Sequence, residues 1–442
     1  MEVGGLWGHP LATDATALHW NPAGLSATSG TSWMLEAAPQ FAEVRLERHH
    51  PYFGGVNRYR TAAVAPFAAV KTKVGRIGMG LGLSVPYGKA SKSLDGPFGV
   101  GSYSLVRGGS FTASMQTGIS YQVLDSVHIG GALAAQWTTF DSHVNMSLVP
   151  ELVSFLGERE FTEGDLEDPA YSTTTRVAGI SGLGWSGSVG IRAQLSSKVY
   201  WGLSYLHGAK VRVRGQGEQS CNCGRPDDEV SAAALQLLGL CNQTLATEFT
   251  NEWRVPWRVQ MAIQWHPSAN VEWTFMGAFV RWSQFDAYAI TISEVDTFND
   301  VADATAESLH GTKINARDNR DTFWLSVDGK FKVGRRGLIG GRVTYDHAAV
   351  PERMLSANNF DAPTVHLGML GAIQVAKPLQ IGLSVTHQFL APRTVTDGAF
   401  GLRLHKSEGE KARLFWANND GRYTGRITRL GLSLRGTFGG QQ

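Results

Sequence analysis

Large apolar residues alternate with small or polar residues over much of the chain, which is the period-two pattern of β-strands with two different faces. The pattern is clearest over residues 199–206, 381–389 and 430–438. A soluble β-sandwich gives the same alternation with its apolar face turned inward. Several runs here extend over about ten residues or more, which favours tilted strands that cross a membrane.

Short polar turns join these runs in pairs, and long polar segments separate the pairs. The short turns lie near residues 73–76, 124–126, 196–198, 267–270, 334–337 and 377–379. The long segments are 48–59, 88–106, 145–180, 214–252, 293–320, 350–363 and 397–422. Short turns at one end and long loops at the other are typical of outer-membrane barrels. One strand before the six hairpins (31–47) and one after them (423–438) bring the count to about fourteen. We therefore expect an all-β, antiparallel transmembrane β-barrel.

Residues 1–29 do not alternate and are rich in small and turn-forming residues, with a short helix predicted around Ala12–Leu18. The lumen of a barrel of about fourteen strands is wider than side chains alone can fill. We expect residues 1–29 to fold into that lumen as a hatch or plug, and residues 30–442 to form the barrel. The alternative for residues 1–29 is a disordered tail.

The composition agrees with a sheet that meets lipid. Charged residues make up 18% of the 442 residues, below the roughly 25% of soluble domains, and the chain holds 52 Gly, 13 Trp, 11 Tyr and 20 Phe. The formal net charge of +2 lacks the basic excess of a nucleic-acid binder, so we expect no nucleic-acid partner. No stretch approaches the ~18 apolar residues of a membrane helix, so a chain like this one must span a membrane as a closed barrel. The start at Met1 lacks the pattern of a signal peptide, and we interpret the sequence as a mature or trimmed chain.

The run TDATALHWNPAGL, from Thr13 to Leu25, resembles the hatch motif of the FadL-type transporters. These are outer-membrane channels for long-chain fatty acids and aromatic hydrocarbons. Further similarities follow in the family's order at residues 82–88, 271–286 and 321–352. The chain departs from the family at its short start, at Arg353 in place of a second proline, and at Phe438, which lies a few residues before the end.

The resemblance implies a hatch that includes Asp14, Asn21, Pro22 and Ala23. It also implies a kink in the third strand that opens a side door to the bilayer. Pro86, which precedes Tyr87 and Gly88, fits such a kink because proline removes a donor from the strand ladder. The alternative is that Pro86 simply ends the strand.

Two long loops carry apolar residues, which are unusual on exposed loops unless they bind a ligand or pack together. Either the two loops form an outer ligand-binding groove, or they bury each other as a lid, or both. The residues expected there are Leu148, Leu152, Phe155 and Leu156 in 145–180, and Leu235 and Leu238 in 214–252.

A fatty acid carboxylate would need an arginine or a lysine. The candidates are Arg281, Lys313, Arg317 and Arg342, and the sequence does not rank them. Cys221, Cys223 and Cys241 lie in one polar segment, which indicates a disulfide from Cys241 to Cys221 or Cys223. A metal site is the alternative, but it lacks a clear fourth ligand.

No catalytic constellation is apparent, because no helix follows the glycines of residues 78–82 and no nucleophile elbow is present. We therefore expect no enzyme, cofactor or metal. The prediction is a monomeric channel, in contact with outer-membrane lipid and lipopolysaccharide, for passive uptake of hydrophobic small molecules, with long-chain fatty acids first among them. The path would run from the loop groove through the hatch-gated lumen to a lateral opening near strand 3. The alternative is the same barrel as a structural or accessory subunit of a surface or export complex. A continuous apolar cavity and a gap near Pro86 distinguish the transporter from the scaffold.

Overall fold

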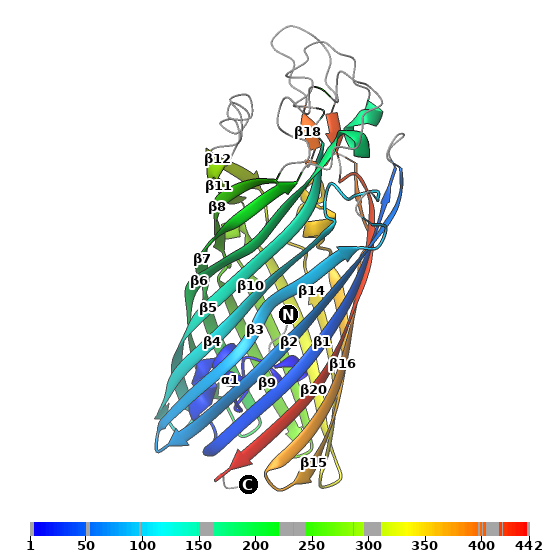
Figure 1. The fold of residues 1–442 in the computed structure, drawn as a ribbon. Coiled ribbons are helices and arrows are strands. Elements are labelled where there is room, and N and C mark those ends of the chain that lie inside the picture. Colours follow the sequence, from blue (N-terminus) through cyan, green and yellow to red (C-terminus); the bar gives the residue numbers. More distant parts are fainter. Residues whose placement is uncertain are drawn as a thin grey trace.

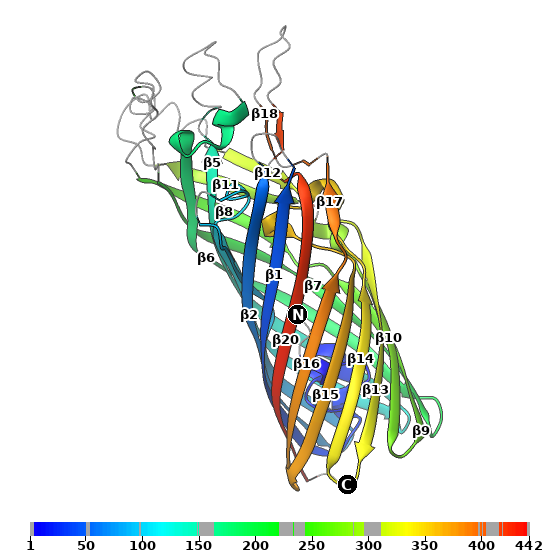
Figure 2. The ribbon, with the colours of Figure 1, turned by 90° about the vertical axis from the view of Figure 1, so that its right-hand side faces the viewer.

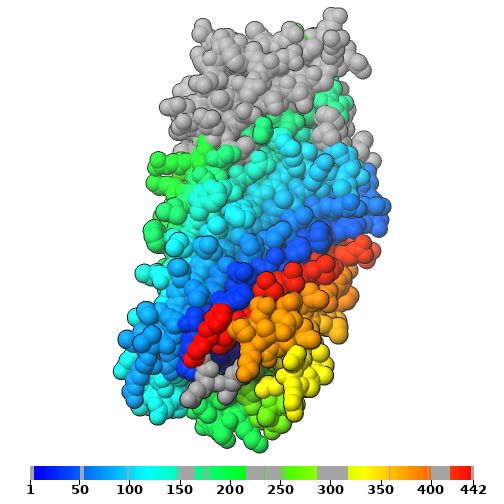
Figure 3. Space-filling view, turned by 60° about the horizontal axis from the view of Figure 1, so that its bottom comes forward, coloured from blue at the N-terminus to red at the C-terminus, as the bar shows by residue number. Residues whose placement is uncertain are grey.

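The strands of the protein form one antiparallel sheet that closes on itself. The computed structural model describes residues 4–49, 54–96, 99–147, 149, 163–220, 233, 244–285, 287–295, 311–396, 398–399, 401–403, 415–417 and 419–439. Strand β1 (Gly30–Arg48) pairs with its neighbour β2 (Gly55–Val74) and also with the last strand, β20 (Gly421–Phe438). Figures 2 and 3 show β20 beside β1, where the two ends of the sheet meet.

The wall of the barrel has fourteen strand positions, as the turn count predicted. The sheet contains eighteen strand elements. Four positions each hold two consecutive elements (β8 with β9, β10 with β11, β12 with β13, β16 with β17), so eighteen elements make fourteen positions. The remaining bounds are β3 Ile77–Ser93, β4 Arg107–Leu124, β5 Val127–Ser147, β6 Ser172–Gln194, β7 Val199–Ser220, β8 Thr244–Arg254, β9 Arg258–Ser268, β10 Val271–Val280, β11 Ala287–Val295, β12 Gly311–Ala316, β13 Thr322–Val333, β14 Gly337–Asp346, β15 Thr364–Ala376, β16 Leu379–Leu390 and β17 Arg393–Val395.

Short helices and one small hairpin complete the described part of the chain. The hairpin pairs β18 (Gly401–Arg403) with β19 (Phe415–Ala417). The helices are η1 Gly5–Trp7, α1 Ala17–Trp20, η2 Pro22–Ser26, η3 Glu163–Glu167, η4 Pro169–Tyr171, η5 Trp282–Phe285, η6 Glu352–Met354 and η7 Ala357–Asn359. The helix expected around Ala12–Leu18 therefore begins only at Ala17. Among the described residues, no helix is long and apolar enough to cross a membrane.

The alternation of the strands has its apolar face outward. On β4, Met115 is 55% exposed, whereas its inward-facing neighbours Ser114 and Gln116 are 1% and 7% exposed. The same arrangement recurs around the barrel, for example at exposed Phe275 beside buried Thr274 on β10. Apolar side chains outside and polar side chains inside are the reverse of a soluble sandwich, and they are what a strand between lipid and a polar lumen requires.

All six predicted short turns lie at one end of the barrel, at the bottom of Figure 1, and the longer connections lie at the other end. The strands are longer than the sequence indicated. The β5 and β6 strands extend to Ser147 and from Ser172, and β7 and β8 extend to Ser220 and from Thr244. The two connections therefore shrink from 145–180 and 214–252 to residues 148–171 and 221–243.

Candidate ligand-binding site and pathway

Residues 4–29, the N-terminal segment, lie inside the barrel near the end with the short turns (Figure 1). Asn21 anchors the centre of this segment. Its side-chain amide donates hydrogen bonds to the carbonyls of Pro10 and of Ile191 in β6, both at 3.0 Å, and its Oδ1 accepts one from the Ala23 backbone N–H at 3.2 Å. One buried side chain thus fixes the fold of the segment and joins it to the wall.

Further hydrogen bonds tie the segment to the barrel on several sides. The Trp7 indole donates to Ser433 of β20 at 3.0 Å, and the Ser204 hydroxyl of β7 donates to the Trp20 carbonyl at 2.7 Å. Arg435 of β20 pairs with the Asp14 carboxylate and lies over the Trp7 ring. Because these partners come from strands far apart in the wall, the segment is held across the lumen.

Inward-facing glycines of the wall let the segment approach closely. A Cβ at Gly130 of β5 would lie 2.5 Å from the Pro22 carbonyl carbon, and one at Gly78 of β3 would lie 2.4 Å from that of Leu25. A Cβ at Gly190 of β6 would lie 2.0 Å from the Asn21 side-chain oxygen. No other residue fits at these positions without displacing the segment.

Above the segment lies a cavity of about 410 Å3 inside the barrel. Its floor includes His19 and Trp20, and Phe360 and Asp361 line it from the connection between β14 and β15. Its walls include Pro86, Tyr87, Val255, Pro256, Arg258 and Trp324. The lining is partly apolar and partly polar, which suits an amphipathic molecule.

Arg258 lies at the floor of this cavity. Its guanidinium lies 5.4 Å from the Trp20 ring centre and 3.2 Å from His19 Nε2. Since a guanidinium can only donate, His19 accepts at Nε2 and is neutral. Burial, together with the nearby Arg258 charge, holds the pKa of His19 well below its usual value. No carboxylate pairs with Arg258 among the described residues.

The wall is irregular at the predicted kink. Between Ser84 and Tyr87, two residues of β3 face a single residue of β4. On the other side, pairing with β2 stops after Ser84 and resumes at Ala90. Pro86 lies inside the strand at this bulge, where a missing N–H costs no ladder bond. Pro86 therefore interrupts β3 without ending it.

The Tyr87 side chain packs from the bulge against a buried apolar cluster on β6, on β7 and directly after β8. That cluster includes Ile180, Val211 and Val255. Tyr87 and Pro86 both line the lumen cavity. The irregular part of β3 thus lies against the same space that Arg258 faces.

On the outer face, an apolar groove of about 690 Å3 lies over the bulge. Leu83, Met115 and Trp137, which are exposed, line it together with Val85 and Glu36, which are buried. The groove therefore reaches into the wall where the ladder is interrupted.

The connection between β14 and β15, residues 347–363, packs over the lumen at the end opposite to the short turns. Val350, Met354 and Leu355 are buried in a cluster with Tyr59 of β2 and Tyr423 of β20. The Asp361 carboxylate accepts hydrogen bonds from the Ala349 and Val350 backbone N–H groups. Burial raises the pKa of Asp361 despite these bonds. We call residues 347–363 the cap.

The structure distributes the other predicted residues unevenly. Arg281 is exposed, with its guanidinium 5.7 Å from the Trp257 ring centre, and Arg317 is buried, but neither lines the cavity. Arg342 pairs with Asp328 and donates to the Gly8 carbonyl, so it holds the N-terminal segment. Lys313 lies in β12, and its side chain is outside the described part. Also outside the described residues are Leu148, Leu152, Phe155, Leu156, Leu235, Leu238, Cys221, Cys223 and Cys241.

Arg258, His19 and Trp324 were not predicted. The alternation of apolar and polar residues predicts that Arg258 and Trp324 face the lumen. The same is true of many other residues, so the pattern does not single these two out. His19 lies within the hatch motif. Nothing in the sequence around His19 and Trp20 indicates that these two side chains line a cavity. Only the folded barrel brings these residues together.

A closed antiparallel barrel with an apolar outer face and a polar inner face defines an outer-membrane β-barrel protein. The chain belongs to the outer membrane transport protein family OMPP1/FadL/TodX, whose family model matches residues 8–389. It is therefore an outer-membrane channel of a family that transports hydrophobic compounds, and not an enzyme.

Solved structures show the same fold. A Pseudomonas aeruginosa FadL homologue is 16% identical, with a TM-score of 0.78 over 98% of this chain and 97% of that one. The Ralstonia pickettii toluene transporter TbuX is 14% identical, with a TM-score of 0.66 over 99% and 100% of the two chains. The P. putida toluene transporter TodX is 13% identical, with a TM-score of 0.66 over 98% and 95%. A search of curated proteins finds no match.

Proposed function

We propose that the protein takes up long-chain fatty acids passively. The substrate would enter between the extracellular loops, pass through a lumen that the N-terminal segment closes as a hatch, and leave sideways at the β3 bulge. The single observation that carries the choice of a fatty acid is the Arg258 guanidinium beside the Trp20 ring. A carboxylate at Arg258 would gain a charge-assisted hydrogen bond, and a hydrocarbon chain would pack on the aromatic lining.

The lateral exit is supported by three features that meet at one place. The lumen cavity reaches Pro86 and Tyr87, β3 carries an extra residue there, and an outer apolar groove lies over the same bulge. A scaffold would have a filled lumen and a regular wall at β3. The cavity and the bulge therefore favour transport over the accessory role.

Uptake of radiolabelled oleate by cells that make this protein tests the proposal. We expect uptake above that of cells with an empty vector, and competition by unlabelled palmitate that is stronger than competition by toluene. Uptake equal to the empty control contradicts the proposal, and stronger competition by toluene assigns the channel to aromatic hydrocarbons instead.

A further inference from the structure

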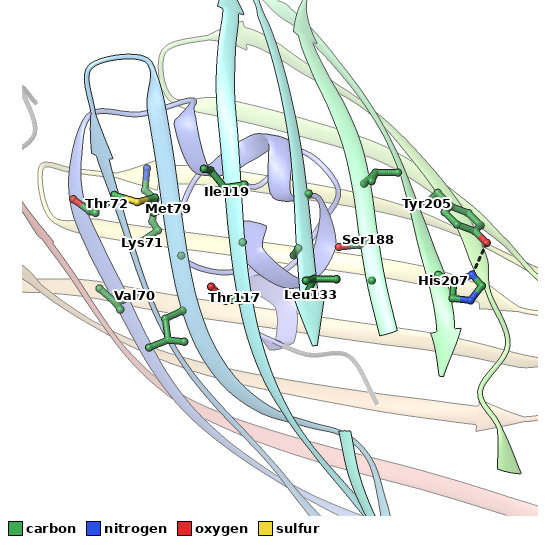
Figure 4. Close-up of a pocket in the computed structure, with 17 residues that line it drawn as sticks. Val70, Lys71, Thr72, Met79, Thr117, Ile119, Leu133, Ser188, Tyr205 and His207 are labelled. Carbon is green, nitrogen blue, oxygen red and sulfur yellow. Dashed lines mark hydrogen bonds between the residues drawn. The ribbon is translucent and has the colours of Figure 1, made fainter. Parts of the chain in front are cut away.

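A second apolar groove, of about 840 Å3, lies on the outer wall across strands β2 to β7 (Figure 4). Two rows of outward-facing residues form it, and in each row the residues are cross-strand partners. One row is Val70, Leu81, Thr117, Leu133, Gly187 and His207, and the other is Thr72, Met79, Ile119, Gly131, Val189 and Tyr205. Six strands give five spacings of about 4.8 Å, so the groove is about 24 Å long.

Two outward-facing glycines hollow the groove. Gly131 of β5 and Gly187 of β6 lie between larger residues, and a Cβ at either would find only ordinary contacts, with Ser188 O at 3.6 Å and Ala132 O at 3.5 Å as the nearest atoms. Gly130, the neighbour of Gly131, faces inward against the N-terminal segment. The wall here has no steric need for glycine at Gly131 or Gly187, so their effect is the depth of the groove.

The groove is continuous with the one at the β3 bulge. Leu81 and Thr117 line this groove, and the next outward residues along the same strands, Leu83 and Met115, line the groove over the bulge. A hydrocarbon chain that emerges at the bulge can therefore pass into this groove without contacting a charged side chain.

One end of the groove lies near the short turns, and the other lies near exposed charged residues of β7. Thr72 and Met79 lie close to the turn at Gly75 and Arg76, at the end with the short turns. At the other end the Tyr205 hydroxyl lies 3.1 Å from His207 Nδ1. Figure 4 marks this hydrogen bond with a dashed line. Three residues beyond His207, Lys210 forms an exposed ion pair with Glu252. The track thus runs obliquely between the polar ends of the wall.

We infer that this groove is a lipid-side binding track for the hydrocarbon chain of a released fatty acid, which it guides from the β3 bulge toward the periplasmic leaflet. The inference rests on the proposed function. The groove is longer than the roughly 15 Å of one leaflet's hydrocarbon, so an extended long hydrocarbon chain fits along the groove. Its occupant is argued from continuity with the bulge, where such a chain would emerge.

Replacement of both glycines tests the track. The variant Gly131→Leu/Gly187→Leu fills the groove, and Gly341→Leu/Gly371→Leu is the matched control. Gly341 and Gly371 also face outward, on β14 and β15, with Gly368 O at 3.5 Å from a Cβ at Gly341 and nothing within 4 Å at Gly371. Oleate uptake is measured per folded protein at the cell surface, and oleate affinity is measured on the purified proteins.

We expect the groove variant to take up oleate roughly tenfold more slowly, as the loss of about 60 Å2 of apolar contact would give. Its oleate affinity at the lumen cavity stays that of the wild type, because neither glycine lines that cavity, and the control variant is unchanged in both assays. Uptake by the groove variant at the wild-type rate overturns the track. Absence of uptake by the wild type overturns the proposed function itself.

Photolabelling identifies the occupant. A diazirine fatty acid should label the peptides of Gly131 and Gly187 in nanodiscs more strongly than a diazirine phosphatidylethanolamine does. Equal labelling by the phospholipid shows that the groove holds bulk lipid, and it overturns the inference while the proposed function stands.

Discussion

The Asn21 side chain donates a hydrogen bond to the Ile191 carbonyl at 3.0 Å, and this bond joins the centre of the N-terminal segment to the wall of the barrel. The Asn21 side chain can reach the Ile191 carbonyl because the neighbouring Gly190 has no side chain in its way. The bond links the hatch motif of the sequence to a glycine-rich strand about 170 residues away in the chain.

Asn21→Ala should loosen the segment. The change removes two donated hydrogen bonds and one accepted one, and it leaves the Pro10 and Ile191 carbonyls without this donor. At about 1 kcal/mol for each bond, docking weakens by about 3 kcal/mol. We expect higher and noisier single-channel conductance in planar bilayers. Conductance equal to that of the wild type would falsify the anchoring role of Asn21.

Gly130→Ala should displace the segment, whereas Gly131→Ala should not. The first Cβ would lie 2.5 Å from the Pro22 carbonyl carbon, and the second lies 3.6 Å from its nearest neighbour. Overpacking of this kind costs roughly 1–3 kcal/mol. Limited proteolysis of the folded barrel is expected to cut the N-terminal segment faster in Gly130→Ala alone. Equal cutting of both variants would show that the wall does not hold the segment at this point.

The barrel itself could be predicted from the sequence because its signals are local. Short turns and alternation depend on neighbouring residues, and they correctly indicated all six hairpins and the first and last strands. The four interruptions, between β8 and β9, between β10 and β11, between β12 and β13, and between β16 and β17, were missed. Pro256 is the local sign of the first of these, and Pro392 is that of the last.

The site was harder to predict because it depends on contacts between distant residues. Pro86 carries a local signal, since proline has no N–H to donate, but that signal alone leaves a kink and the end of a strand equally open. Arg258 could not be distinguished from Arg281 or Arg317, because its importance comes from the meeting of β9 with His19 and Trp20. The cap is a polar segment in sequence, and only its packing against Tyr59 and Tyr423 shows that it lies over the lumen.

Arg258→Met should weaken the binding of fatty acids selectively. A hydrogen bond to a charged group contributes about 1.5–3 kcal/mol, so oleate affinity should fall roughly ten- to hundredfold. Oleyl alcohol has no carboxylate, so its affinity should change little. Isothermal titration of the purified barrel with both ligands measures the difference. An equal loss for both ligands would mean that Arg258 acts through packing and not through its charge.

Acidification should weaken docking of the N-terminal segment. Burial holds the pKa of His19 below its usual value, and burial with the charges of Lys330 and Arg342 does the same for His9. In an undocked segment both histidines titrate near pH 6.5. Below about that pH the undocked segment therefore binds more protons than the docked segment. Docking becomes weaker as the pH falls. The pKa of Asp14 is lowered too, so protonation of Asp14 weakens docking only below about pH 4.

Conductance at pH 5 should therefore exceed that at pH 7.5. The groups that face His19 are Arg258 of β9 and Gln116 of β4, whose side-chain amide lies 3.3 Å from Nδ1. His19→Gln keeps hydrogen-bonding atoms at this position and should reduce the pH dependence. A pH dependence that the variant retains in full would assign it to other groups.

Deletion of Pro86 tests the central claim most directly. β3 carries one residue more than β4 between Ser84 and Tyr87, so the deletion brings the two strands into regular pairing and closes the bulge. The account predicts that oleate uptake falls to the level of cells with an empty vector, while the purified, folded variant still binds oleate. Uptake at the wild-type rate through the closed wall would contradict a lateral exit at β3.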